Sequence, residues 1–180
     1  LWKNMVTRQM YISGGIGSRY HHEAFGRDFE LTSERAYTET CAAVGSVMWA
    51  QRMLALEGDA CYADVMEQAL YNAVLPGLSL SGDRYFYQNP LADEGTHRRQ
   101  EWFSTACCPP NVARLLGYLP GLFYSTSGRT VYVHLYARGS AEFTVDGQVV
   151  RMEQETDYPW SGRIRLRIRT AGSFELKLRV

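Results

Sequence analysis

The chain has 180 residues, of which 46% are hydrophobic and 21% are charged. This composition is sufficient for at least one hydrophobic core and excludes a disordered or fibrous protein. Nineteen basic and nineteen acidic side chains give a formal net charge of zero, so bulk charge gives no reason to expect nucleic acid or an anionic membrane as a partner. No apolar run approaches the ~20 residues that a membrane-spanning helix needs. Function must therefore depend on a local site.

Both ends of the sequence have the features of truncations. The chain starts at Leu1 with neither an initiator methionine nor a signal-peptide pattern. Residues 174–180 stop inside a strand-like alternation, without a following turn. We therefore expect a piece of a longer protein. Because no secretion signal is seen, we expect a cytoplasmic location.

Residues 1–126 predict helices joined by Gly-rich and aromatic loops. Apolar residues recur with helical spacing over about residues 40–56 and 60–73, and Asp59 is the predicted N-cap of the second helix. A third helix is predicted to begin at the Pro109-Pro110 pair, because proline suits the first helical turn. Antiparallel packing of these helices is the simplest arrangement.

Residues 127–180 show the period-two alternation of β-strands. Asp146-Gly147 predicts a hairpin turn, and the arginines of the third strand are assigned to a solvated face. Together these features predict the start of an antiparallel β-sandwich that follows a helical domain of residues 1–126. The predicted strands cover residues 130–136, 141–145, 163–169 and 174–180.

All four cysteines lie in the helical half. Cys107 and Cys108 are adjacent, and neighbouring Cα atoms ~3.8 Å apart do not suit a disulfide, whose Cα atoms are ~5.5 Å apart. Free thiols or a metal site are therefore favoured over a disulfide framework. Cys61 lies in an ordinary amphipathic helix, where we expect it to be buried.

The arrangement of one glutamate and three cysteines suits a metal site, with free thiols as the alternative because no Cys-x-x-Cys pair is present. Two prolines follow Cys107 and Cys108, so both sulfurs lie at a helix N-terminus, where free N–H groups favour thiolate. Glu39 and Cys41 share a face only where the chain is extended, which places them at the start of the helix of residues 40–56. Two helix N-termini then bring together three sulfurs and one oxygen, a set that suits four-coordinate zinc. We expect these atoms within about 4 Å of one another.

Glu23 follows the glycine-rich segment of residues 13–18. A phosphate loop is not supported there, because no Lys-Ser/Thr and no preceding strand are present. The glycines fit a flexible loop that allows the backbone to approach a ligand. A lone glutamate in a loop is usually solvated, and this is the default expectation for Glu23. Aromatic loops at residues 84–90 and 100–103 suit either a sugar-stacking cleft or core filling.

Several of these segments resemble a known family. The combination of Glu39-Thr40-Cys41 with Cys107-Cys108-Pro109-Pro110-Asn111 is similar to glycoside hydrolase family 127, the β-L-arabinofuranosidase family. The resemblance implies an (α/α)6 toroid followed by β-sandwich domains. This chain would hold the later part of the toroid in residues 1–126 and the first strands of a sandwich in residues 127–180. The segments that carry the resemblance are residues 11–18, 37–43, 71–75, 99–103 and 106–111.

The resemblance also implies an activity and residue roles. The protein would be a retaining exo-glycosidase that releases terminal β-linked L-arabinofuranose from a small-molecule or oligosaccharide substrate. Cys107 matches the nucleophile, Glu23 the general acid/base and Tyr87 a substrate-binding tyrosine close to the nucleophile. Earlier toroid helices, which this chain does not contain, would supply further sugar-binding residues. The implied zinc ligands are Glu39, Cys41, Cys107 and Cys108.

Two other interpretations stay open at this point. In one, the chain is a zinc-stabilised structural or carbohydrate-binding module, in which the Cys/Glu cluster only holds helices together. In the other, a glycosidase uses Glu23 and Glu39 as a carboxylate pair without a metal. The position of Glu39 relative to the sulfurs distinguishes the second of these from a metal site.

Overall fold

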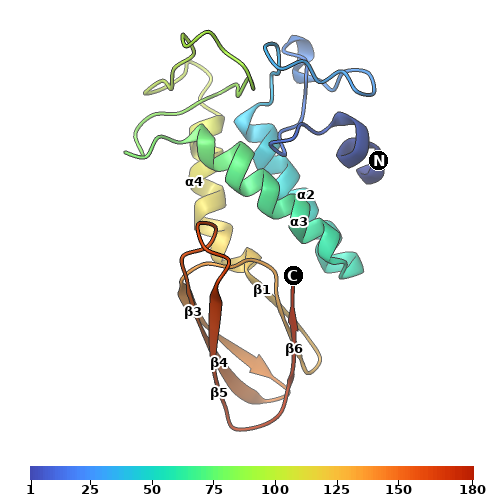
Figure 1. Ribbon diagram of the computed structural model, residues 1–180, viewed down its shortest axis with the longest axis vertical. Coiled ribbons are helices and arrows are strands. Elements are labelled where there is room, and N and C mark those ends of the chain that lie inside the picture. The colour runs from blue at the N-terminus through green and yellow to red at the C-terminus, as the bar shows by residue number, and fades with distance from the viewer. The chain divides into compact units, whose positions relative to one another are not determined.

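The computed structural model describes residues 1–180, which form two compact units, Leu1–Gly117 and Tyr118–Val180 (Figure 1). The first unit is helical and the second is formed mainly by strands. No helix combines the length and the apolar composition needed to cross a membrane.

Three main helices form the first unit: α2 (Thr40–Glu57), α3 (Ala60–Ala69) and α4 (Cys108–Tyr118). Helix α2 ends at Gly58, whose φ of 69° lies in the left-handed region that glycine adopts without steric cost. The predicted N-cap of α3 is confirmed, because the Asp59 carboxylate accepts a hydrogen bond of 2.9 Å from the backbone N–H of Cys61. Shorter helical segments are α1 (Trp2–Asn4), the π-helical turns Met5–Gln9 and Leu70–Val74, and the 3₁₀ turns His21–Glu23 and Leu75–Gly77.

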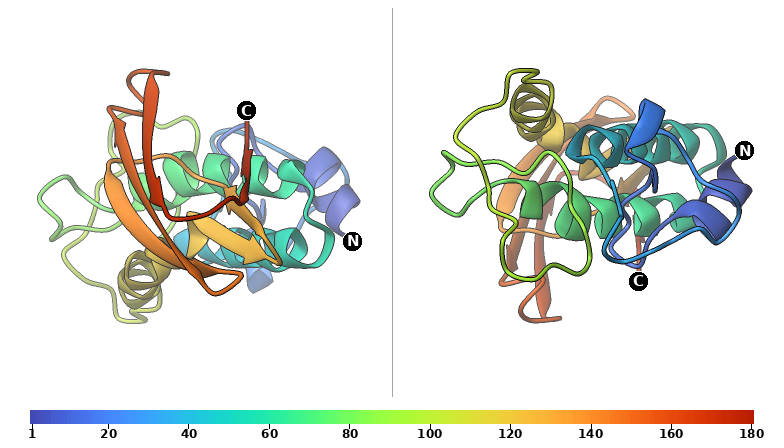
Figure 2. Two further views of the ribbon diagram at one scale, coloured as in Figure 1. Left: turned by 90° about the horizontal axis from the view of Figure 1, so that it is seen from below. Right: turned by 90° about the horizontal axis from the view of Figure 1, so that it is seen from above.

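Helices α2 and α3 pack side by side, as Figures 1 and 2 show. Val44 and Val47 of α2 and Met66 of α3 are fully buried, and each such side chain contributes about 1.5–3 kcal/mol by leaving water. Cys61 is exposed, so the expectation that it is buried is wrong. It lies in the first turn of α3, outside the face of this helix that Tyr62, Val65 and Met66 bury.

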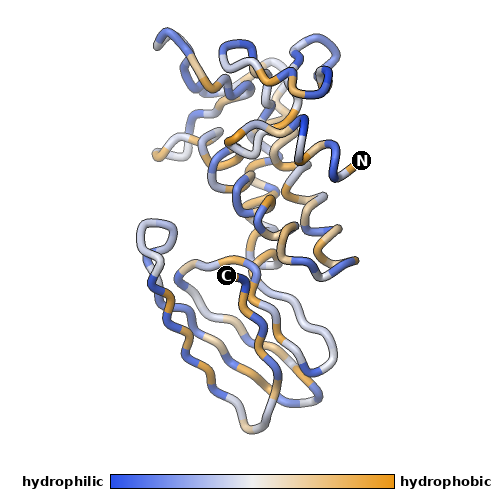
Figure 3. Tube along the Cα trace, turned by 45° about the vertical axis from the view of Figure 1, so that its right-hand side comes forward, coloured by the Kyte–Doolittle hydropathy of each residue, from blue (hydrophilic) through white to orange (hydrophobic).

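Six strands form two three-stranded sheets in the second unit, with the orders β1-β2-β6 and β3-β4-β5. Figure 3 shows the alternation of hydrophilic and hydrophobic residues along them. The 3₁₀ turn Leu119–Leu122 precedes the first strand. The strands are β1 (Tyr124–Ser127), β2 (Thr130–Val133), β3 (Gly139–Val145), β4 (Gln148–Thr156), β5 (Ile164–Thr170) and β6 (Glu175–Leu178).

Apolar side chains of β2, β3 and β4 form one buried cluster, including Val131, Val145 and Met152. The β3–β4 hairpin turns at Asp146 and Gly147, which have φ of 52° and 74°. Positive φ at both residues is the geometry that a two-residue hairpin favours, as the Asp-Gly pair predicted. The solvated face of β5 is also found, because Arg165 and Arg167 pair with Glu155 of β4 at 3.1 and 2.8 Å.

The sequence did not predict β1 or β4, and the expectation of a wholly antiparallel arrangement is wrong for one pair. Strands β2 and β6 are parallel, whereas the other strand pairs are antiparallel. The chain leaves the β3-β4-β5 sheet after β5 and joins the other sheet beside β2. Alternation determines which side chains face a core, but it does not determine the direction in which a strand runs.

Two adjacent leucines of α4 test whether one face of this helix packs in a hydrophobic core. Leu115 is fully buried, whereas Leu116 is 37% exposed. We expect Leu115→Ala to lower the free energy of unfolding by about 2–5 kcal/mol, because it removes buried methyl groups and leaves a cavity. Leu116→Ala is the matched control, with an expected cost of about 1 kcal/mol or less. Urea unfolding followed by circular dichroism measures both, and equal costs would contradict the packing of α4.

Candidate active site

The start of α2 is fixed by an extended segment that lies beside it. The backbone N–H of Thr40 donates to the carbonyl of Tyr87 at 2.9 Å, and the Thr40 hydroxyl donates to the carbonyl of Phe86 at 2.8 Å. Glu39 occupies the N-cap position with ψ of 138°, so the chain is still extended there. This confirms the predicted position of Glu39 and Cys41 at a helix N-terminus. It also holds Tyr87 close to both.

The second pair of predicted ligands lies at the start of α4. The backbone N–H of Asn111 donates to the carbonyl of Cys107 at 3.1 Å, which closes the first turn. Helix α4 begins at Cys108, one residue before the two prolines, so both sulfurs lie at the helix N-terminus as predicted. Cys108 is fully buried, and Cys107 is partly exposed.

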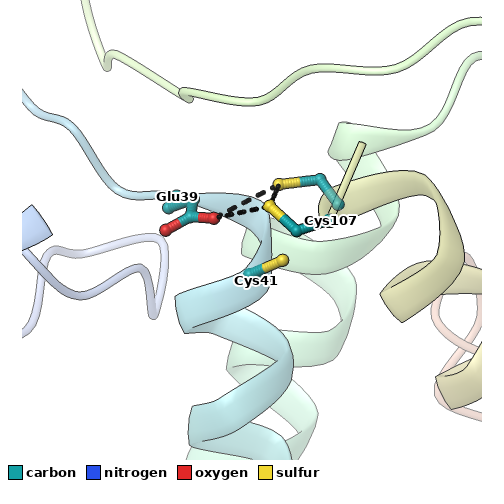
Figure 4. A group of neighbouring side chains, drawn as sticks. Glu39, Cys41 and Cys107 are labelled. Atoms are coloured by element: carbon teal, nitrogen blue, oxygen red, sulfur yellow. Dashed lines mark hydrogen bonds between the residues drawn. The ribbon is translucent and has the colours of Figure 1, made fainter. Parts of the chain in front are cut away.

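Glu39, Cys41, Cys107 and Cys108 converge, and their ligand atoms all lie within 4.8 Å of one another (Figure 4). This is slightly wider than the expected spacing. The thiols of Cys107 and Cys108 donate to Oε1 of Glu39 at 3.3 and 3.5 Å, and their two sulfurs are 3.8 Å apart. Glu39 is only 8% exposed. It is therefore part of the sulfur cluster, which argues against a metal-free carboxylate pair with Glu23.

The cluster has the chemistry of a cation site. Four acidic groups crowd together, and no basic side chain forms a hydrogen bond or an ion pair with any of them. A hydrogen bond from Cys108 lowers the pKa of Cys41 to about 7, and the same contact raises the pKa of Cys108. Burial raises the pKa of Cys107. A divalent ion would offset this crowding and hold the thiols as thiolates.

The donor set and its spacing fit a metal ion. Three sulfurs and one carboxylate oxygen are all accepted ligands of four-coordinate zinc. Ligand sulfurs at ~2.3 Å from a tetrahedral ion lie about 3.8 Å apart, which is the separation found for Cys107 and Cys108. The residues present could therefore hold such an ion with small adjustments.

Glu23 and Tyr87 lie next to this cluster. The Tyr87 hydroxyl is 3.1 Å from the sulfur of Cys107 and 3.4 Å from Oε1 of Glu23. A second hydroxyl, that of Tyr37, donates to the same Oε1 at 2.8 Å. Burial, followed by the contact with Glu23, raises the pKa of Tyr37. The predicted nucleophile and the predicted acid/base are thus separated by a single phenolic oxygen.

A cavity of about 680 Å³ opens beside these residues. Glu23, Tyr37 and Tyr87 form part of its wall, together with the aromatic ring of Phe103, which meets the Tyr87 ring edge to face at 5.4 Å. A cavity of about 780 Å³ in the second unit is lined mainly by charged and polar side chains and holds none of the predicted site residues. The first cavity is therefore the candidate substrate site.

Sequence reasoning assigned no role to two residues that contact the site, Tyr37 and Asn111. The Asn111 side-chain amide donates to the sulfur of Cys41 at 2.9 Å, which favours the thiolate of that residue. Both residues lie inside the segments that carry the family resemblance. Asn111 follows Cys107 by four residues, which is the spacing of one helical turn and the only local signal for its role.

Comparisons with known proteins agree with this geometry. Residues 1–121 match the family model for the β-L-arabinofuranosidase GH127 catalytic domain, and residues 130–180 match that for the GH127 middle domain. The chain is 39% identical to a non-reducing end β-L-arabinofuranosidase of Bifidobacterium longum subsp. longum, over 91% of this chain and 26% of the relative.

Solved structures of GH127 proteins are also similar to this chain. A GH127 β-arabinofuranosidase superposes with a TM-score of 0.98 at 47% identity, over 100% of this chain and 28% of that one. A GH127 β-L-arabinofuranosidase from Geobacillus stearothermophilus T6 superposes with a TM-score of 0.94 at 44% identity, over 100% of this chain and 30% of that one. The chain thus spans between a quarter and a third of the length of these relatives.

These matches place the chain in the class of the glycoside hydrolases. More narrowly, it belongs to glycoside hydrolase family 127, as its sequence motifs predicted.

Metal content tests the four-residue cluster. We expect the protein, produced with this sequence at the length of its relatives, to hold about one zinc ion per chain by elemental analysis. Cys108→Ser should lose this ion, because it removes a buried sulfur ligand. Cys61→Ser is the matched control, since Cys61 is exposed and lies outside the cluster. Equal zinc content in the two variants would contradict the assignment of the cluster.

Proposed function

We propose that the chain carries the catalytic centre of a retaining exo-β-L-arabinofuranosidase, with Cys107 as nucleophile and Glu23 as general acid/base. The observation that supports this most strongly is the position of the Tyr87 hydroxyl, 3.1 Å from the Cys107 sulfur and 3.4 Å from Glu23. A thiol and a carboxyl group on two sides of one hydroxyl, beside one cavity, can act on one glycosidic bond. A purely structural zinc module gives no reason for Glu23 to lie there.

In this proposal Glu39, Cys41, Cys107 and Cys108 hold a zinc ion. Zinc, when bound, supplies positive charge that keeps Cys107 deprotonated at neutral pH. A thiolate is intrinsically more nucleophilic than the carboxylate that most retaining glycosidases use. The metal would therefore adjust the nucleophile and leaving group, and it would not serve mainly to activate water.

The reaction then has two steps. The Cys107 thiolate attacks the anomeric carbon, while the bond to the leaving oxygen breaks with its electron pair and Glu23 gives that oxygen a proton. The product is a thioglycosyl enzyme. Glu23 next takes a proton from a water molecule, whose oxygen attacks the anomeric carbon and releases the Cys107 thiolate. Two inversions retain the configuration of the sugar.

The substrate in this proposal is a terminal, β-linked L-arabinofuranose on an oligosaccharide or small molecule. The cavity wall combines aromatic rings with polar side chains such as Gln88 and His97. Rings and hydrogen-bonding groups of this kind suit an uncharged sugar. The printed name of the Bifidobacterium relative describes the same bond, at a non-reducing end.

For the architecture, we propose that residues 1–126 belong to an (α/α)6 toroid and residues 127–180 to an incomplete β-sandwich. The agreement of the helical unit with a GH127 catalytic domain and of the strands with the middle domain supports this division. We also propose a cytoplasmic location.

Replacement of the nucleophile tests the activity. We expect Cys107→Ser to lower turnover of an aryl β-L-arabinofuranoside by at least about 10³-fold, because removing a covalent nucleophile usually has an effect of this size. The measurement is release of the aryl group by a protein with this sequence at the length of its relatives. Cys61→Ser should keep the parent rate. Full activity of Cys107→Ser would rule out Cys107 as nucleophile.

A further inference from the structure

We propose that Tyr37 is a positioning residue for Glu23, and that it leaves Oε2 of Glu23 as the oxygen that carries the transferred proton. This inference rests on the proposed function, because it concerns Glu23 as general acid/base. It assigns a role to a residue whose hydroxyl donates to Glu23 and to none of the sulfurs of the cluster. Its basis is the geometry around Glu23.

The backbone at Glu23 is strained. His22 and Glu23 have φ of 61° and 49°, in the left-handed region that residues other than glycine adopt infrequently. A short antiparallel bridge closes this turn, since Arg19 and Ala24 exchange backbone hydrogen bonds of 3.0 and 3.1 Å. Such a conformation persists only where surrounding contacts fix it. The bridge fixes the backbone, but the carboxyl group needs contacts of its own.

Tyr37 provides the shorter of these contacts from a rigid position. It is only 4% exposed, and its ring meets that of Tyr20 edge to face at 5.4 Å. Its backbone N–H donates to Ser18 at 3.4 Å, and its carbonyl accepts a hydrogen bond of 3.2 Å from Asn89. A donor whose ring and backbone are both held is well suited to orient another side chain.

The two tyrosines are not equivalent. Tyr37 donates to Oε1 of Glu23 at 2.8 Å, whereas the hydroxyl of Tyr87 is 3.4 Å away and also contacts Cys107. A phenol has one proton to donate. When that of Tyr87 points to the Cys107 thiolate, Tyr37 alone holds the carboxyl group. Tyr37 therefore keeps Glu23 in place while Cys107 is charged.

The contacts of the Glu23 carboxyl group lie on one of its two oxygens, which decides where the acidic proton lies. Oε1 accepts from Tyr37 at 2.8 Å and has the Tyr87 hydroxyl at 3.4 Å, whereas Oε2 accepts no hydrogen bond from the protein. A carboxylic acid places its proton on the oxygen that is not already an acceptor. In the first step the Oε2–H bond breaks and the proton passes to the leaving oxygen. In the second step Oε2 takes a proton from water.

The test compares substrates that need acid assistance to different extents. Tyr37→Phe removes one hydroxyl and keeps the buried ring. We expect its kcat/KM to fall about 10- to 100-fold for an alkyl β-L-arabinofuranoside, which is part of the usual 10²- to 10⁴-fold effect of a general acid. For a 2,4-dinitrophenyl arabinofuranoside, whose leaving group needs no proton, we expect a change of less than about 3-fold. Zinc content should equal that of the parent.

Tyr62→Phe is the matched control. It removes another buried tyrosine hydroxyl that donates to a glutamate, Glu57, away from the site. We expect equal, small changes for both substrates. Equal losses for both substrates in Tyr37→Phe, or no loss for either, would overturn the inference, because a merely structural role does not depend on the leaving group.

Glu23→Gln separates this inference from the proposed function. It should show the same dependence on the leaving group, with a larger effect, because it removes the acid itself. If Glu23→Gln affected both substrates equally, the role of Glu23 as general acid would fail. If Glu23→Gln showed the dependence and Tyr37→Phe did not, only the role of Tyr37 would fail.

Discussion

The close approach of four acidic groups is the constraint on which the rest of this site depends. Three thiols and the carboxyl group of Glu39 lie within 4.8 Å of one another, without a basic side chain bonded to any of them. Burial raises the pKa of the Cys107 thiol, which favours its protonated form until a cation is present. The same arrangement could hold a metal ion close to the Cys107 sulfur, where its charge would favour the thiolate.

The helices and loops around the cluster serve to hold it together. Helix α2 and helix α4 each contribute an N-terminus, where free N–H groups favour anionic ligands. Thr40 joins the start of α2 to the segment that carries Tyr87 through hydrogen bonds of 2.8 and 2.9 Å. That segment then reaches Glu23, which is 64 residues away in sequence from Tyr87. In this way the Cys/Glu cluster is joined through Tyr87 to Glu23, and both Tyr87 and Glu23 line the cavity.

Much of the local structure could be predicted from the sequence. The start of α2, the N-cap at Asp59 and the Asp146-Gly147 hairpin depend on short patterns, and the structure contains all three. The convergence of Glu39 with the cysteines was also predictable, because two helix N-termini and a favourable donor set limit the choices. These features are local or follow from chemistry that few residues can supply.

Features that depend on long-range contacts could not be predicted in this way. The parallel pairing of β2 with β6 follows from contacts between segments that are distant in the sequence. The role of Tyr37 depends on where the loop of Glu23 folds back, which no periodicity in the sequence describes. Both consecutive positive φ angles in that loop occur at residues other than glycine, so the sequence carries no conformational signal for them.

The most direct test of the central claim is to locate the covalent bond between enzyme and sugar. A mechanism-based trap with β-L-arabinofuranosyl configuration would be reacted with a protein that carries this sequence at the length of its relatives, and the labelled peptide would be identified by mass spectrometry. We expect one sugar on the sulfur of Cys107 and none on Cys61. A label on the carboxyl group of Glu23 or Glu39, with Cys107 unmodified, would contradict it.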